Sequence, residues 1–156
     1  MTRRVAASTL TSRQKMALSV LVTFILTAAS TPAVAEGSWS SSVSGGLAGG
    51  FSSRWWDDRQ LDSNPTRASF ASCRIRELGQ NATRIQTTLY RDNGIFPDHN
   101  HGTINNPCNG SSASWGNGLP AGSFRWELGP VSFTSGGGTV STTGYHVDIP
   151  SLSTWY

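Results

Sequence analysis

The segment Ser-Phe-Arg-Trp-Glu-Leu, residues 123–128, decides the fold class of this chain. Apolar and polar side chains alternate through it without a break, and this two-residue period is typical of a β-strand with one face on a core. The apolar members are Phe124, Trp126 and Leu128. We therefore expect a strand here, with Trp126 buried.

Three further segments show the same alternation, and turn sequences separate them. The segments are 68–75, 82–91 and 144–150, the last closed by Pro150, and hairpin turns are expected at 78–81 and 135–138. Helix signals are nearly absent after residue 36, whereas Thr, Ser, Gly and aromatic residues are abundant. The pattern predicts an all-β fold, a small antiparallel β-sandwich, with a small barrel as the alternative.

The stretch 92–121 has no clear alternation and is rich in Gly, Pro and Asn. We expect a long irregular loop there. Loops of this length in a small domain are usually functional or held down covalently.

Residues 1–35 have the three parts of a secretory signal peptide. Four basic residues lie among the first fifteen, an apolar run follows at 17–29, and Ala33-Val34-Ala35 is typical of a cleavage site. The apolar run is shorter than the ~20 residues that a transmembrane helix needs, so a membrane anchor is the less favoured alternative. We expect this leader to be removed and the protein to be secreted into the extracellular medium.

The basic character of the whole chain belongs to this leader. The leader holds four of the twelve Lys and Arg residues and none of the acids, so residues 36–156 carry eight basic and nine acidic residues and a net charge of −1. A nearly neutral domain gives no electrostatic support for binding nucleic acid or an anionic membrane.

Cys73 and Cys108 are the only cysteines in the chain. In an exported protein, a disulfide between them is favoured over metal ligation or a reactive thiol. A single domain of roughly 100 residues has a small core, so such a bond would stabilise it.

Residues 36–53 differ in composition from the rest of the chain. They carry no charge after Glu36, and their large apolar residues recur at every fourth position: Trp39, Val43, Leu47 and Phe51. Several glycines in the same segment disfavour a helix. We expect a flexible Gly/Ser-rich arm that becomes ordered on the surface of a partner through main-chain hydrogen bonds, followed by a single β domain at 54–156.

Two adjacent tryptophans, Trp55 and Trp56, follow the arm. Neighbouring side chains on a strand point to opposite faces, so at most one indole can enter the core and the other is available to a partner. Both therefore join the four apolar arm residues as candidate partner-binding residues. Trp115, in a Gly/Asn-rich stretch, is a candidate surface aromatic. Because exposed indoles also stack on sugar rings, a carbohydrate-binding, lectin-like module is the alternative function.

One tetrapeptide, Asp98-His99-Asn100-His101, has the side chains of a metal site. Histidines two residues apart share a strand face and suit zinc or copper, but no spacing pattern supplies a third ligand. We expect ordinary loop residues here, no metal and no cofactor. A small secreted hydrolase that uses two of the many acids is the second alternative. No motif of a nucleophile with its base is present, so we expect no catalytic residue and no enzyme.

The layout of an arm at 36–53, followed by a β domain of roughly 100 residues with one disulfide, resembles the small adaptor subunits of the umbrella toxin particles that filamentous soil bacteria secrete. In that family the adaptor connects a lectin subunit with a trypsin-like fold to a repeat-containing toxin, and its N-terminal extension threads the lectin's cleft. The resemblance implies a non-catalytic connector in an extracellular complex that acts against competing bacteria. Its partners would be other secreted proteins, with no role for nucleic acid or membrane.

Overall fold

The computed structural model describes residues 37–156. The leader predicted at 1–35 and the first residue of the predicted arm, Glu36, lie outside the described residues. The described chain is all-β, as expected, and contains no helix long and apolar enough to cross a membrane.

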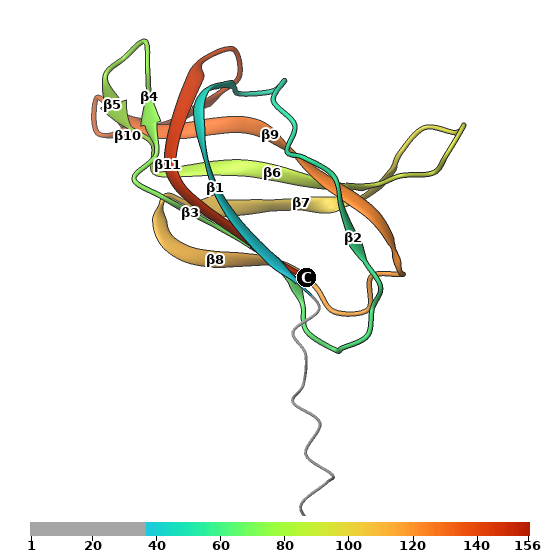
Figure 1. Ribbon diagram of the computed structural model, residues 1–156. Helices are drawn as coiled ribbons and strands as arrows, with labels where there is room; N and C mark the ends of the chain where they lie inside the picture. The colour runs from blue at the N-terminus through green and yellow to red at the C-terminus, as the bar shows by residue number, and fades with distance from the viewer. Residues whose placement is uncertain (1–36) are drawn as a thin grey trace, which may run out of the picture. The chain divides into compact units, whose positions relative to one another are not determined.

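Residues 37–156 form eleven strands (Figure 1). They are β1 (Ser38–Leu47), β2 (Trp56–Asp58), β3 (Thr66–Ala71), β4 (Arg74–Ile75), β5 (Gln80–Asn81), β6 (Arg84–Arg91), β7 (His99–Pro107), β8 (Asn109–Gly116), β9 (Gly122–Ser135), β10 (Gly138–Thr142) and β11 (His146–Trp155).

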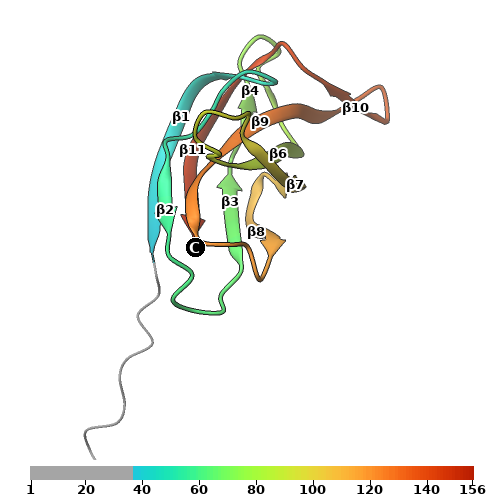
Figure 2. The ribbon, with the colours of Figure 1, turned by 90° about the vertical axis from the view of Figure 1, so that its right-hand side faces the viewer.

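The strands are arranged in two antiparallel sheets that do not close into a barrel, which confirms the predicted sandwich. The first sheet has the order β5-β4-β11-β3-β8, and β1 pairs with β11. The second has the order β10-β9-β6-β7, and β2 pairs with β9. In Figure 2, β1 lies along the left margin of the domain, and it belongs to a different sheet from β2.

The core lies between the sheets and is centred on Trp126 of β9. Phe124, Trp126 and Leu128 are each at most 1% exposed, as the alternation at 123–128 predicts. The indole of Trp126 stacks on Trp39 and packs against Phe70, with ring centroids 6.2 and 5.4 Å apart. Aromatic side chains bury more apolar area than any others, so this group supplies much of the stabilisation.

The predicted irregular loop at 92–121 is wrong in its extent, because β7 and β8 lie within it. Each forms the edge of a sheet, where both faces of a strand tolerate polar side chains, so no alternation marks them. The inward Asn106 is fully buried, and its amide donates a hydrogen bond to Thr87 Oγ1 at 3.0 Å. Irregular backbone remains at 92–98 and 117–121.

Pro150 does not end the last strand as predicted. At this residue β11 changes partner from β4, which pairs with Val147 and Asp148, to β3, which pairs from Ser151 onward. The register between β11 and β1 is irregular at the same place. A proline, which has no N–H to donate, is tolerated at such an irregularity.

The predicted disulfide between Cys73 and Cys108 is present. Cys108 lies where the chain leaves β7 in one sheet and enters β8 in the other. Backbone hydrogen bonds flank the bond, since Ser72 N–H donates to Cys108 O and Ala82 N–H donates to Cys73 O, both at 2.9 Å. The disulfide therefore holds the crossover between the sheets against the junction of β3 and β4. Such a bond is typical of proteins in an oxidising compartment.

The flexible arm predicted at 36–53 is contradicted for the described residues 37–53. β1 pairs with β11 along its whole length, from Ser38↔Trp155 to Leu47↔His146, with two irregular steps. The glycines permit these bulges rather than disorder: Gly45 has a left-handed φ of 65°, which L side chains rarely adopt. Composition alone does not separate a bulged edge strand from a flexible segment.

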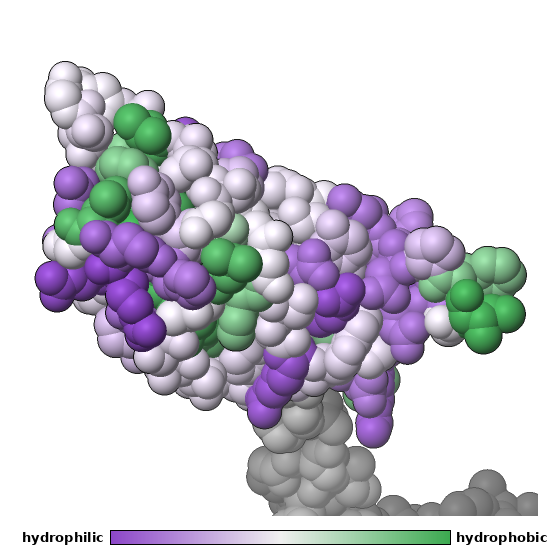
Figure 3. Space-filling view, turned by 90° about the horizontal axis from the view of Figure 1, so that it is seen from above, coloured by the Kyte–Doolittle hydropathy of each residue, from purple (hydrophilic) through white to green (hydrophobic). Residues whose placement is uncertain are grey.

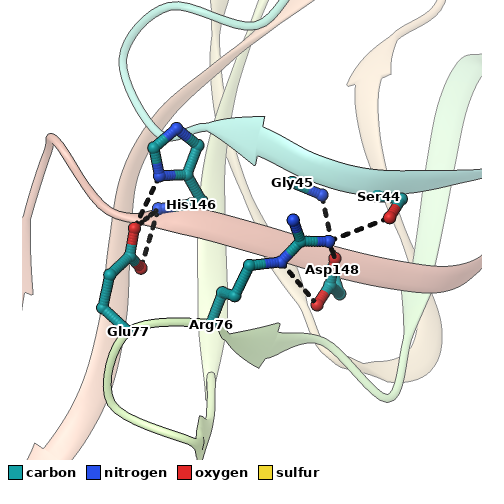
Figure 4. A network of polar contacts seen from close by, with 6 residues as sticks. All are labelled: Ser44, Gly45, Arg76, Glu77, His146 and Asp148. Carbon is teal, nitrogen blue, oxygen red and sulfur yellow. Dashed lines mark hydrogen bonds and ion pairs between the residues drawn. The ribbon is translucent and has the colours of Figure 1, made fainter.

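A polar network anchors the glycine-containing half of β1 (Figure 4). Asp148 of β11 accepts a hydrogen bond from Gly45 N–H at 2.8 Å and pairs with the guanidinium of Arg76, which also donates to Ser44 Oγ at 2.9 Å. These contacts lower the pKa of Asp148, first through Arg76 and then through the Gly45 amide. The network joins β1, β11 and the β4–β5 hairpin at one point.

Candidate functional site

The residues predicted to bind a partner through the arm pack largely on their own domain. Val43 and Trp56 are buried, and Trp39 and Phe51 are partly buried against the core. Leu47 is 40% exposed at the end of β1. The arm residues therefore do not form a free partner-binding segment, and most of them hold the sandwich together.

The adjacent tryptophans separate as strand geometry requires. Trp56 is 5% exposed and packs between the two sheets, whereas Trp55 is 45% exposed on the outside of the domain. The guanidinium of Arg125 lies over the Trp55 ring, 5.1 Å from its centroid. Of the pair, only Trp55 remains available to a partner.

Arg125 is the centre of a group on the outer face of β9, which we call the Arg125 cluster: Ser52, Trp55, Tyr90, Asp98, Arg125 and Glu127. The guanidinium donates to Asp98 Oδ2 at 2.9 Å and to Ser52 Oγ at 2.7 Å, and it also pairs with Glu127. Burial acts to lower the pKa of Arg125, but the two carboxylates outweigh it and raise that pKa. The same cation therefore pairs with both acids, and the three side chains together keep a net charge of −1.

The cluster holds the base of a projecting loop, residues 92–98, which we call the tip loop. β6 and β7 pair up to Arg91↔His99, and the loop extends beyond this pair, at the right of Figure 1. Asp98 ties its second end to Arg125, and Asp92 Oδ1 accepts a hydrogen bond from Gly94 N–H at 2.8 Å near its first end. The tip loop thus has a defined conformation.

Two large apolar side chains occupy the end of the tip loop. Ile95 is 96% exposed and Phe96 is 65% exposed, and in Figure 3 the end of this projection is hydrophobic. Neither residue was predicted as functional. A usable signal was present in the sequence, because an Ile-Phe pair between Asn-Gly and Pro lies in a turn, where a core position is not expected.

The Asp98–His101 tetrapeptide does not form a ligand set. The rings of His99 and His101 meet edge to face with centroids 4.7 Å apart, while Asp98 is engaged by Arg125. Burial, with the neighbouring His99 and Arg91, lowers the pKa of His101. Within residues 37–156, no group of three or more Cys, His, Asp or Glu side chains is arranged to hold a metal ion.

Trp115 is partly buried rather than a free surface aromatic. Its ring packs against the core, and its indole N–H donates to Gly102 O at 3.2 Å, which connects β8 to β7. The acids proposed for a hydrolase also have structural partners. Asp58 accepts a hydrogen bond from Gln60 N–H, and Asp92 and Asp98 hold the tip loop.

No model of a protein family, no curated protein and no solved structure matches this chain.

Proposed function

We propose that this chain is a secreted, non-catalytic protein-interaction module, an adaptor in an extracellular toxin-like complex, and that it binds one partner through the tip loop. The exposure of Ile95 and Phe96 is the observation that carries the proposal. Two neighbouring large apolar side chains on this projection expose apolar area to water, and their insertion into a pocket of another protein would remove that area from water and gain free energy. The Arg125 cluster presents the tip and lowers the entropy cost of binding.

The charges near the tip favour a protein over a lipid surface as its partner. Membrane-inserting loops usually carry Lys or Arg beside their apolar residues, because most such membranes are anionic. Here two aspartates, Asp92 and Asp98, flank the apolar pair in sequence. A basic rim around an apolar pocket on the partner would complement this arrangement.

The test compares one double serine variant and one single serine variant of the mature protein. Ile95→Ser/Phe96→Ser removes the apolar tip, and Leu61→Ser removes an equally large side chain that is 75% exposed on a different loop. Each protein is immobilised and exposed to the other secreted proteins of its source. We expect a stoichiometric partner that the wild type and Leu61→Ser retain and the tip variant loses. Equal retention by the tip variant would contradict the proposal.

Carbohydrate binding is the second candidate, and Trp55 is the observation in its favour. Its exposed indole lies beside Tyr90, Arg125 and two carboxylates, which are side chains that recognise sugars. Against it, Arg125 already covers part of both aromatic rings. The test is retention of the protein on a glycan resin. Retention that Trp55→Ala loses and the tip variant keeps would favour this candidate instead.

A further inference from the structure

β1 has a free edge with open main-chain groups. Gly37 and Tyr156 exchange two backbone hydrogen bonds, each 3.0 Å long. In an antiparallel pair every second residue bonds to the neighbouring strand, so Trp39 and Ser41 also direct their main-chain groups toward β11. The N–H and C=O groups of Ser38 and Ser40 therefore point away from β11. Among residues 37–156, no strand other than β11 pairs with β1.

The regular first part of this edge, Ser38–Ser41, lacks the usual protection against strand addition, because the two bulges of β1 lie beyond it. Natural edge strands are commonly short, or carry Lys or Pro. β1 has ten residues, and its sequence SWSSSVSGGL contains neither charge nor proline.

A groove beside the free edge leads between the two sheets. It has a volume of about 150 Å³ and lies between Ser40–Val43 of β1 and the segment 51–54. We call it the edge groove. Its apolar floor and walls come from Trp39, Val43, Phe51, Trp126 and Leu152. Of the ten residues that line it, only Arg54 is charged, and its guanidinium lies 4.6 Å from the centroid of the Trp39 ring.

The position of the groove indicates an extended chain as its occupant. An added strand would bond to Ser38 and Ser40, and every second side chain of that strand would point toward the space between the sheets. The volume suits one apolar side chain. A second copy of this protein cannot supply that side chain by pairing its β1 with this one. The inward residues of β1, Trp39 and Val43, are already packed on their own core.

We propose that an extended segment of a second secreted protein adds to the free edge of β1, inserts one apolar side chain into the edge groove and places a carboxylate beside Arg54. This surface is distinct from the tip loop, so it would give an adaptor its second partner, and it stands whether or not the tip binds one. Main-chain hydrogen bonds supply affinity, and the groove and Arg54 supply specificity.

The test selects binding peptides from a displayed library of random decapeptides, with the mature protein as the target. We expect the selected peptides to share an apolar residue and a nearby acid. In amide exchange followed by NMR, a bound peptide should protect the amides of Ser38 and Ser40. Ser40→Pro removes one of the outward N–H groups and no main-chain bond to β11, although it also removes the side-chain hydrogen bond between Ser40 Oγ and Ser153 Oγ.

Each variant has a defined expected effect. Ser40→Pro and Arg54→Glu should each weaken peptide binding by roughly tenfold, which corresponds to about 1.4 kcal/mol. Arg54 is exposed at the rim of the groove, so we expect Arg54→Glu to keep the fold. This variant therefore tests the proposal even if Ser40→Pro destabilises β1. The tip variant Ile95→Ser/Phe96→Ser should bind the peptides normally, which separates this proposal from the proposed function.

Three results would overturn the inference. The first is peptide binding that both Ser40→Pro and Arg54→Glu leave unchanged. The second is a failure of the library to yield any peptide that protects Ser38 and Ser40. The third is a concentration-dependent dimer that Ser40→Pro abolishes, because the edge would then serve a second copy of the chain.

Discussion

At the scale of single residues, Asp148 connects the pH of the solution to the attachment of β1. Its carboxylate binds Arg76 and the Gly45 amide, and its pKa in the folded protein is lowered. A lowered folded pKa stabilises the fold above the ordinary pKa of an aspartate, about 3.9, and that stabilisation is lost as the pH falls through the folded value. Protonation should therefore release the glycine-containing half of β1 first.

The measurement is an NMR titration of the Gly45 amide in the folded protein. We expect its chemical shift to change with a midpoint below the ordinary aspartate range, toward the position found in Asp148→Asn at all pH values. Amides of β6 and β9, which are remote from this carboxylate, serve as the control. A Gly45 shift that follows the β6 and β9 amides, or a variant that titrates like the wild type, would show that the contact does not hold β1.

At the scale of elements, alternation of apolar and polar residues predicted the strands that lie inside a sheet and failed at its margins. The segment 123–128 lies within β9, and 82–91 contains β6, because both strands have one face on the core. β1, β7 and β8 escaped prediction for a physical reason. An edge strand needs only one bonded neighbour, and its outer positions accept Gly, Ser, Asn and His at little cost.

Gly45 allows a direct test of β1 as a bulged strand rather than an arm. A Cβ at this position would combine the left-handed φ of 65° with an approach of 2.7 Å to the end of the Arg76 side chain. We expect Gly45→Ala to lower the free energy of unfolding by about 1–2 kcal/mol, most of it from the backbone conformation. The measurement is chemical denaturation of the β-sandwich domain.

Gly138→Ala is the matched control for this substitution. Gly138 lies in β10, where an added Cβ would meet only Ser135 O at 3.8 Å, an ordinary contact. The stability of this variant should stay within about 0.5 kcal/mol of the wild type. A flexible arm would make the two variants equally stable, and that result would restore the interpretation from composition.

At the scale of the whole molecule, the sequence led to the architecture more directly than to the surface that acts. The sandwich and the disulfide follow from strand patterning and from two cysteines in a chain that the sequence predicts to be exported. The candidate site does not, because it depends on which residues the fold leaves outside. Trp55 and Trp56 look equivalent in the sequence, yet Trp56 begins β2 and is buried, whereas Trp55 immediately before the strand is exposed. Ile95 becomes prominent only once β6 and β7 are known to form a hairpin around it.

The disulfide provides the prediction at this scale. Cys73 and Cys108 are 35 residues apart, and closing a loop of that length reduces the entropy of the unfolded chain by an amount worth about 4 kcal/mol in the chain-entropy model. The total stability of a small domain is about 5–15 kcal/mol, so this contribution is a large share of it. We therefore expect Cys73→Ala/Cys108→Ala to be largely unfolded near 37 °C and to show a strongly lowered urea midpoint, with a similar loss in the reduced wild type.

The tip variant Ile95→Ser/Phe96→Ser changes only exposed side chains and should keep the wild-type midpoint. A disulfide-free protein with a midpoint close to that of the wild type would mean that the contacts between β7, β8 and β3 hold the crossover without the covalent bond.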